Sequence, residues 1–239
     1  MAAFLQLLFC LALLLFVCPV DCISDEIIVY QFPPDKLSFN YLIIQPKNAT
    51  SQTSGYAICL RAMFWTWGYR VLIDTENILL GLYNYYPQFG FFKNGQNSFD
   101  FPWEDAIVSP SIWNTFCISF NQSESTVQII INGKLVSTSY CSVGYLPNPI
   151  TIGGKTQVDG RRLSGQITDL NFWNQPLALT EIEEFSSGCN TTNFLEKIKP
   201  ELVSWSKANI TRGSSTSNYT MKREMFCSLL SINNSVQDS

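Results

Sequence analysis

The chain has 239 residues with a formal net charge of −4, and charged residues make up only 14% of it. It has no basic stripe and no polybasic segment, so neither nucleic acid nor an anionic lipid surface is an expected partner. Histidine is absent, which excludes Ser-His-Asp and Cys-His catalytic groups and makes the usual zinc sites unavailable.

Residues 1–22 predict a cleaved signal peptide. Phe4 to Val17 is an almost unbroken apolar run, shorter than the roughly 20 residues that a membrane-spanning helix needs. A signal anchor is the alternative, because the positively charged start that most signal peptides carry is missing. No later stretch approaches membrane length, so we expect a secreted, soluble product without a membrane span.

From Ile27 onward the pattern predicts short β-strands. Apolar or alternating runs are interrupted by Gly, Pro, Asn and Asp roughly every 8 to 12 residues, which is typical of an antiparallel two-sheet sandwich. The roughly 215 residues after the signal are enough for one such domain. The expected strands are Tyr41–Ile44, Tyr56–Phe64, Val71–Ile73, Ile78–Tyr83, Phe89–Phe92, Phe116–Phe120, Thr151–Gly153 and Gly165–Trp173.

One hairpin and one short helix stand out from this pattern. Thr126–Ile131 and Lys134–Ser137 are joined by Asn132-Gly133, which readily supplies the positive φ angles of a type I′ turn. The helix is predicted from Thr180 to Phe185, with Thr180 as its cap and Glu183 three residues later completing a capping box.

Residues 191–239 are rich in Ser, Thr and Asn and offer few apolar anchors. We expect them to form an extended appendage behind the sandwich. Six Asn-x-Ser/Thr sequons exceed what chance would place in such a chain and predict a surface-glycosylated protein. The sequon asparagines are Asn48, Asn121, Asn190, Asn209, Asn218 and Asn233.

The cysteines fit an oxidising compartment, where structural disulfides are the default. Cleavage after Val20 keeps Cys22 and gives six cysteines, whereas cleavage after Cys22 leaves one thiol over. Cys141 either pairs with Cys22, stays free or joins two chains. No C-x-x-C pair is present.

Several segments together resemble a pentraxin domain, a jelly roll of the concanavalin A-like and laminin G-like type. The resemblance covers about residues 28–190 and implies two antiparallel sheets with Cys59 paired to Cys117. It leads us to divide the chain into a signal peptide (1–22), a pentraxin-like domain (25–190) and the glycosylated extension (191–239). The segments that carry it are Tyr56–Arg61, Trp113–Phe120, Val127–Lys134, Ile150–Gly153 and Leu163–Trp173.

The tail is similar to the region that follows the pentraxin domain in certain adhesion G-protein-coupled receptors. Leu202-Val-Ser-Trp205 and Met225-Phe-Cys227 carry this similarity, which implies a second disulfide between Cys189 and Cys227. The chain would then be a secreted form, an ectodomain fragment of a cell-surface receptor, or a free-standing relative.

The pentraxin resemblance also implies where a calcium site would lie. Soluble pentraxins hold two calcium ions with an Asp-Asn pair and a Glu-Gln-Asp run, and bind phosphocholine or other anions through them. Glu76 and Asn77 align with the first locus, and Lys155-Thr-Gln157 aligns with the second. Arg161 and Gln166 fall where further ligands belong. Calcium takes six to eight oxygens, so Lys155 and Arg161 make this a vestigial locus, with calcium weakly used and no cofactor required.

Lys155, Arg161 and Arg162 are instead a candidate anion-binding set. The alternative is an ordinary charged turn after Asp159-Gly160. A shift of the alignment by one or two residues would restore Asp159 or Asp74 as a calcium ligand.

The leading hypothesis is a secreted recognition or adhesion module that binds an extracellular protein or glycan. The alternative is a calcium-dependent soluble pentraxin that acts in innate pattern recognition as a cyclic oligomer, and a homo-oligomer is compatible with both. A glycan-active enzyme would need two carboxylates at a defined separation, but Glu181, Glu183 and Glu184 lie on the predicted helix. We therefore expect no enzyme.

Overall fold

The computed structural model describes most of the chain from residue 26 to residue 229. The predicted signal peptide lies outside this part. No described helix is both long enough and apolar enough to cross a membrane. The described residues are 26–34, 41–46, 54–65, 70–74, 78–83, 86–93, 96–100, 108–109, 111–140, 148–153, 163–188, 191–213, 216–223 and 225–229.

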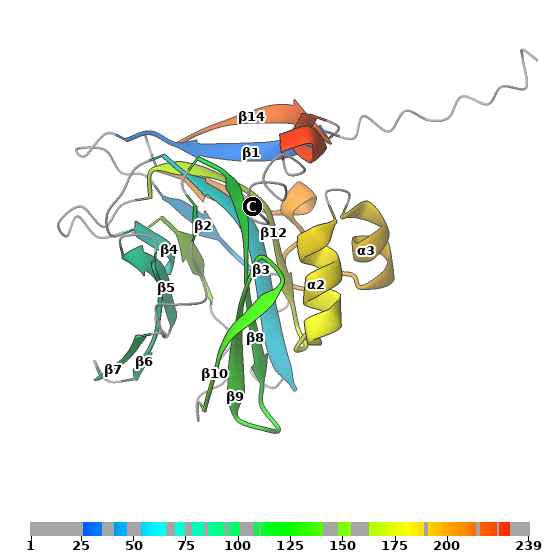
Figure 1. Ribbon diagram of the computed structural model, residues 1–239. Helices are drawn as coiled ribbons and strands as arrows, with labels where there is room; N and C mark the ends of the chain where they lie inside the picture. The colour runs from blue at the N-terminus through cyan, green and yellow to red at the C-terminus, as the bar shows by residue number, and fades with distance from the viewer. Residues whose placement is uncertain are drawn as a thin grey trace, which may run out of the picture.

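Two seven-stranded antiparallel sheets face each other, which confirms the predicted all-β sandwich (Figure 1). We call the sheet that carries the helices on its outer face the helix-side sheet. Its strand order is β10 (Lys134–Tyr140), β9 (Thr126–Ile131), β8 (Trp113–Asn121), β3 (Gly55–Phe64), β12 (Gly165–Trp173), β1 (Glu26–Phe32) and β14 (Ser217–Lys222). The order of the second sheet is β13 (Ile210–Arg212), β2 (Leu42–Ile44), β11 (Ile150–Ile152), β4 (Arg70–Asp74), β5 (Ile78–Tyr83), β6 (Tyr86–Lys93) and β7 (Gln96–Asp100).

Strand β3 shows how the sequence builds two separate cores. Side chains alternate across a strand, so Ile58 and Leu60 face the core between the sheets, whereas Ala57 and Cys59 belong to a second cluster beneath the helices. All four are fully buried. Each large apolar side chain buried in this way contributes about 1.5 to 3 kcal/mol, which explains why both faces of this central strand read as apolar in the sequence.

The disulfide that the resemblance implied joins Cys59 and Cys117. The two residues are direct partners in the pairing of β3 with β8. Their sulfur atoms lie on the helix-covered face, in the same cluster as Trp173. Cys227 is also disulfide-bonded, to a cysteine outside the described residues, so its pairing with Cys189 stays a prediction.

The β9–β10 hairpin has the predicted turn. Asn132 and Gly133 have φ angles of 51° and 78°, as a type I′ turn requires. The Asn132 side chain also accepts a hydrogen bond from the Thr115 backbone (2.8 Å) and donates one to Asn114 Oδ1 (3.1 Å). The turn is thereby tied to the neighbouring strand β8.

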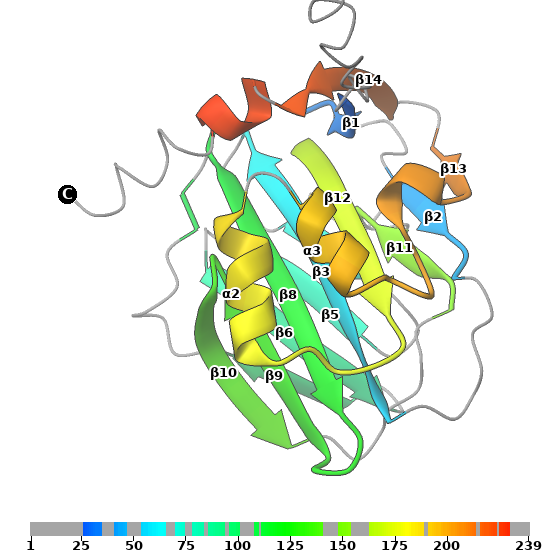
Figure 2. The same ribbon diagram turned by 90° about the vertical axis from the view of Figure 1, so that its right-hand side faces the viewer.

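The helix prediction was right in place but wrong in its cap. Helix α2 spans Leu179–Ser187 and begins after Ala178, so Thr180 lies inside the first turn. Glu181 closes that turn, because its carboxylate accepts a 2.7 Å hydrogen bond from the Ala178 backbone. The predicted cap, Thr180, therefore lies two residues after the observed cap, Ala178. A second helix, α3 (Thr192–Lys197), was not predicted and lies beside α2 (Figure 2).

The segment after residue 190 differs from the extended appendage that the sequence predicted. Strand β14 pairs with β1 over six residues, and β13 pairs with β2. Both sheets therefore end on strands from this segment. Phe194, Trp205 and Phe226 are buried and supply the apolar anchors. They are far apart in a polar sequence and produce no local periodicity, which is why the composition misled the prediction.

Candidate ligand-binding groove

The site residues predicted from the pentraxin resemblance, Glu76, Asn77, Lys155, Arg161 and Arg162, lie outside the described residues. The structure does place the strands that lead to them side by side. Strands β4 and β11 are neighbours in the second sheet, with Thr151 opposite Asp74. Within the described ranges, no group of three or more Cys, Asp or Glu side chains could hold a metal ion.

Gln166 does not lie where the resemblance placed it. It is on β12 opposite Met63, and it forms a hydrogen bond with Tyr219 of β14. Met63 and Tyr219 both pack against a small apolar cluster of the helix-side sheet that includes Trp113 and Phe226. Gln166 therefore belongs to the sheet opposite β4 and β11 and is excluded from a calcium locus there.

A groove opens on the helix side of the molecule where β1 and β12 diverge. The two strands pair only from Tyr30 to Phe32. Farther along β12, its partner is the segment around Val203, which bridges to Phe172. The groove has a volume of about 590 Å³ and is lined by the start of β1, the middle of β12, residues 199–209 and Arg223.

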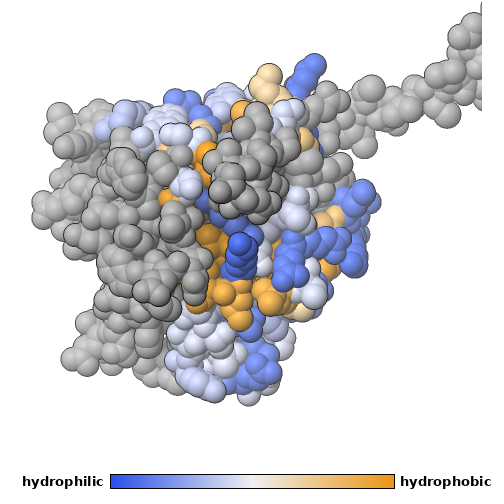
Figure 3. All heavy atoms as spheres, in the orientation of Figure 1, coloured by the Kyte–Doolittle hydropathy of each residue, from blue (hydrophilic) through white to orange (hydrophobic). Residues whose placement is uncertain are grey.

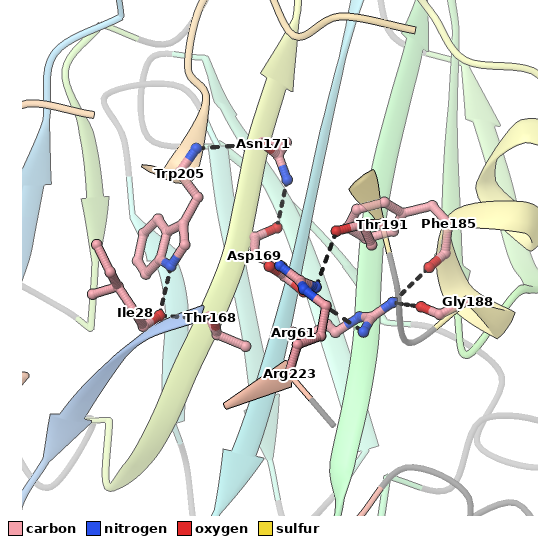
Figure 4. Close-up of polar contacts among 10 residues, drawn as sticks. All are labelled: Ile28, Arg61, Thr168, Asp169, Asn171, Phe185, Gly188, Thr191, Trp205 and Arg223. Carbon is pink, nitrogen blue, oxygen red and sulfur yellow. Dashed lines mark hydrogen bonds and ion pairs between the residues drawn. The ribbon is translucent and has the colours of Figure 1, made fainter. Parts of the chain in front are cut away.

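The floor of the groove is a β-bulge in β12. The register shifts between Thr168 and Asn171, and Asp169 has a φ of 51°, an angle that Asp and Asn tolerate better than other non-glycine residues. The Asn171 amide donates a 3.0 Å hydrogen bond to the Asp169 carbonyl, and its oxygen accepts one of 3.4 Å from the Trp205 backbone (Figure 4). The bulge turns Asp169 and Asn171 toward the groove lining.

Two arginines approach the Asp169 carboxylate beneath the groove (Figure 4). Oδ2 of Asp169 lies 3.6 Å from Nη1 of Arg61 and 3.8 Å from Nη1 of Arg223. Arg223 also donates a 3.4 Å hydrogen bond to Oγ1 of Thr191. A buried charge is tolerated only when it is paired, so these contacts explain how Asp169 can be 4% exposed.

Arg61 is fully buried and links β3 to the end of α2. Its Nη2 donates hydrogen bonds to the carbonyls of Phe185 (2.7 Å) and Gly188, where the negative end of the helix dipole favours a cation. Burial lowers the pKa of Arg61, the Asp169 carboxylate opposes this, and Arg223 adds to the lowering. The guanidinium also stacks near the rings of Phe185 and Phe226, at 5.3 and 5.4 Å.

Trp205 fixes the wall that faces β1. It begins the one-turn 3-10 helix η1 (Trp205–Lys207), and its indole donates a 2.7 Å hydrogen bond to the Ile28 carbonyl. The Thr168 hydroxyl donates to the same carbonyl at 2.8 Å. The indole meets the Tyr30 ring edge-on at 5.2 Å. The groove is therefore built on fixed elements.

The rim carries exposed charges of both signs, among them Glu26, Glu196, Lys199 and Lys207. Figure 3 shows hydrophilic side chains clustered over the helix-side surface. The volume of the groove lies within the roughly 300 to 1,000 Å³ usual for small-ligand sites. The lining combines apolar residues such as Leu202 and Val203 with polar ones such as Ser204 and Asn209, a mixture that suits a small ligand with both apolar and hydroxyl-bearing faces.

Sequence reasoning missed this groove, although two residues gave a signal. Arg61 interrupts the apolar run of β3, and Asp169 lies between the apolar residues Ile167 and Leu170 of β12. A charged residue at a core position implies a buried partner. The signal indicates that a pair exists, but it does not reveal that the two residues are neighbours or that β1 diverges beside them.

Comparison with known proteins identifies the fold class. The sequence model of a family described as "Concanavalin A-like lectin/glucanases superfamily" matches residues 40–183. No curated protein sequence matches the chain. A native heptameric SAP-like pentraxin from Limulus polyphemus is similar in structure, with a TM-score of 0.63 and 14% identity over 81% of this chain and 94% of that one.

Two further solved structures share the fold. A putative carbohydrate binding protein from Bacteroides ovatus has a TM-score of 0.60 and 12% identity, over 82% of this chain and 60% of that one. Botulinum neurotoxin type C, whose cell entry depends on two ganglioside molecules, has a TM-score of 0.50 and 15% identity over 67% of this chain and 42% of that one. At these identities the likeness establishes the fold.

Proposed function

This chain belongs to the concanavalin A-like lectin/glucanase superfamily, and from that premise we propose that it is a secreted recognition module that binds a short glycan. The observation that carries the proposal is the groove of about 590 Å³, with Asp169 and Asn171 in its lining and charges of both signs on its rim. Since a fold does not fix a function, the proposal rests on this site.

A glycan fits the groove better than a peptide strand does. An extended peptide would need a free strand edge, but the Phe172 backbone is already bonded to Leu202 and Val203, and the Ile28 carbonyl accepts two side-chain donors. The names of two structural relatives, a putative carbohydrate binding protein and a toxin dependent on gangliosides, support the same ligand class.

Secretion is part of the proposal. The Cys59–Cys117 disulfide is of the kind that persists in oxidising compartments. Asn209 and Asn218, two of the sequon asparagines, are exposed, as glycosylation requires. The signal peptide, the glycans and the similarity to adhesion receptors stay predictions, as does an anion-binding role for Lys155, Arg161 and Arg162.

We further propose that the module binds without catalysing. The chain has no histidine, and the carboxylate at the base of the groove, Asp169, is engaged by two guanidinium groups. Glycoside hydrolysis uses two carboxyl groups that face the scissile bond from opposite sides. Asp169 is committed to holding Arg61 and Arg223 in place.

A calcium-dependent pentraxin is the second candidate function, favoured by the match to 94% of the Limulus pentraxin chain. In that protein class the resemblance implies ligand binding through calcium. In this chain the corresponding loci carry Lys155 and Arg161. Calcium dependence therefore separates the two candidates.

The test is a glycan array probed with the secreted, glycosylated protein in calcium buffer and in chelator. The proposal predicts binding to a defined set of short glycans at equal strength in both buffers. Binding that disappears in chelator would favour the pentraxin alternative. Absence of glycan binding in both buffers would contradict the proposal and leave a protein ligand as the outcome.

A further inference from the structure

Asn209 belongs to two features at once. It is the asparagine of the sequon Asn209-Ile210-Thr211, and it is one of the residues that line the groove. It is exposed. We propose that the N-linked glycan on Asn209 lies over the groove and competes with the external ligand, so that glycosylation of this residue gates the site. The identity of that ligand as a glycan rests on the function proposed above.

The position of Asn209 is fixed on both sides. On one side, Ala208 closes the η1 turn with a hydrogen bond to the Trp205 carbonyl, and the Trp205 indole is bonded to Ile28. On the other side, Ile210 and Thr211 pair with β2 as the first residues of β13. The side chain that would carry the glycan is therefore held at the rim, and the first sugars must start there.

The other described sequons do not share this placement. Asn218 lies on β14 opposite Tyr30, and Asn121 ends β8, where its side chain accepts hydrogen bonds from Ser123. Neither lines the groove. Glycans at these positions serve as internal controls for any effect of glycosylation on solubility or folding.

The chemistry of the groove suits the first sugars of such a glycan. Ser204, Ser206 and Lys207 line the groove just before Asn209 and offer hydroxyl and ammonium groups to sugar hydroxyls. Tethering through a short linker gives a bound group an effective concentration on the order of millimolar. A tethered glycan therefore competes with a free glycan and weakens its apparent binding without abolishing it, through contacts no stronger than ordinary sugar contacts.

The test uses two matched variants of the secreted protein. Thr211→Ala removes the Asn209 sequon and leaves Asn209 in the groove lining, and Thr220→Ala does the same for the Asn218 sequon. Both threonines are exposed on strands, β13 and β14. The readout is acylation of lysine amines, followed residue by residue by mass spectrometry. Lys199 and Lys207 report on the groove, and exposed Lys134 on β10 reports on the remote surface.

The proposal predicts several-fold faster labelling of Lys199 and Lys207 in Thr211→Ala, with Lys134 unchanged and with wild-type rates in Thr220→Ala. It also predicts stronger glycan binding by Thr211→Ala than by the wild type. Unchanged labelling in Thr211→Ala, or a secreted wild type that carries no glycan at Asn209, would overturn it.

The two readouts separate this proposal from the function on which it rests. Faster groove labelling without glycan binding by either protein supports the glycan cover and counts against the proposed function. Unchanged labelling with equal glycan binding by both proteins overturns the cover and leaves the proposed function standing.

Discussion

Arg61 on β3 and Asp169 on β12 form a buried ion pair beneath the groove, with Nη1 and Oδ2 3.6 Å apart and side chains 0% and 6% exposed. The same guanidinium holds the carbonyls at the end of α2. One pair thus connects the central strands, the helix that covers them and the bulge that shapes the groove floor.

Replacing Arg61 by Met should be severely destabilising. The substitution leaves the Phe185 and Gly188 carbonyls without their buried donor and removes the nearer of the two cations that face the Asp169 carboxylate. Breaking a buried pair in this way costs about 3 to 5 kcal/mol. Unfolding of the secreted protein in guanidinium chloride measures the loss in the free energy of unfolding, with the exposed Lys134→Met as control. A loss below about 1 kcal/mol would show that the pair is dispensable.

Asp169→Asn and Asp169→Ala should differ in stability. Both remove the charge that faces Arg61 and Arg223, but only Asn accepts a φ of 51° at little cost. The Ala variant should therefore be less stable than the Asn variant by about 1 kcal/mol. Thermal unfolding of the two proteins gives the difference. Equal stability would mean that the bulge is not held in this conformation.

Removing the Cys59–Cys117 disulfide should lower stability substantially. The bond closes a loop with a sequence separation of 58, for which chain entropy gives a contribution of about 4 kcal/mol. The double variant Cys59→Ala/Cys117→Ala tests this by denaturant unfolding. Because both positions are buried beside Trp173, Ala also loses packing. A variant as stable as the wild type would contradict the entropic account.

Tyr219 should make stability fall at alkaline pH. Burial raises the pKa of its phenol, and the hydrogen bond with Gln166 opposes this rise. The fold thus favours the neutral phenol, and this contribution is complete below the ordinary pKa of about 10. It is lost as the pH rises through the higher folded value. Unfolding of Tyr219→Phe and wild type across that range isolates the effect. Parallel pH profiles of the two proteins would refute it.

The strands were predictable because their signal is local. Tyr56–Phe64 and Gly165–Trp173 are short runs that are buried on both faces, and such runs bounded by turn residues are typical of strands in a sandwich core. The Asn132-Gly133 turn was predictable for the same reason, because the turn depends on two adjacent residues. The pairing of Cys59 with Cys117 followed from the family resemblance.

The groove could not be predicted because it depends on contacts between distant residues. The groove forms where β1 separates from β12 and the segment around Val203 pairs with Phe172 instead. Val203 follows Phe172 by more than 30 residues in the sequence, and periodicity within a short window does not reveal such a contact. The positive φ of Asp169 also comes from this packing. Trp205 and Phe226, isolated in a polar tail, gave no periodic signal, so the sequence suggested an appendage where the structure has two strands of the sandwich.

Locating the bound glycan tests the central claim most directly. On the Thr211→Ala background, Lys207→Glu alters the groove lining, and Lys134→Glu makes the same charge change on β10. We predict that titration with a glycan selected from the array shows binding weakened at least tenfold (about 1.4 kcal/mol) by Lys207→Glu and unchanged by Lys134→Glu. Equal affinity in both variants would place the binding site elsewhere and contradict the account.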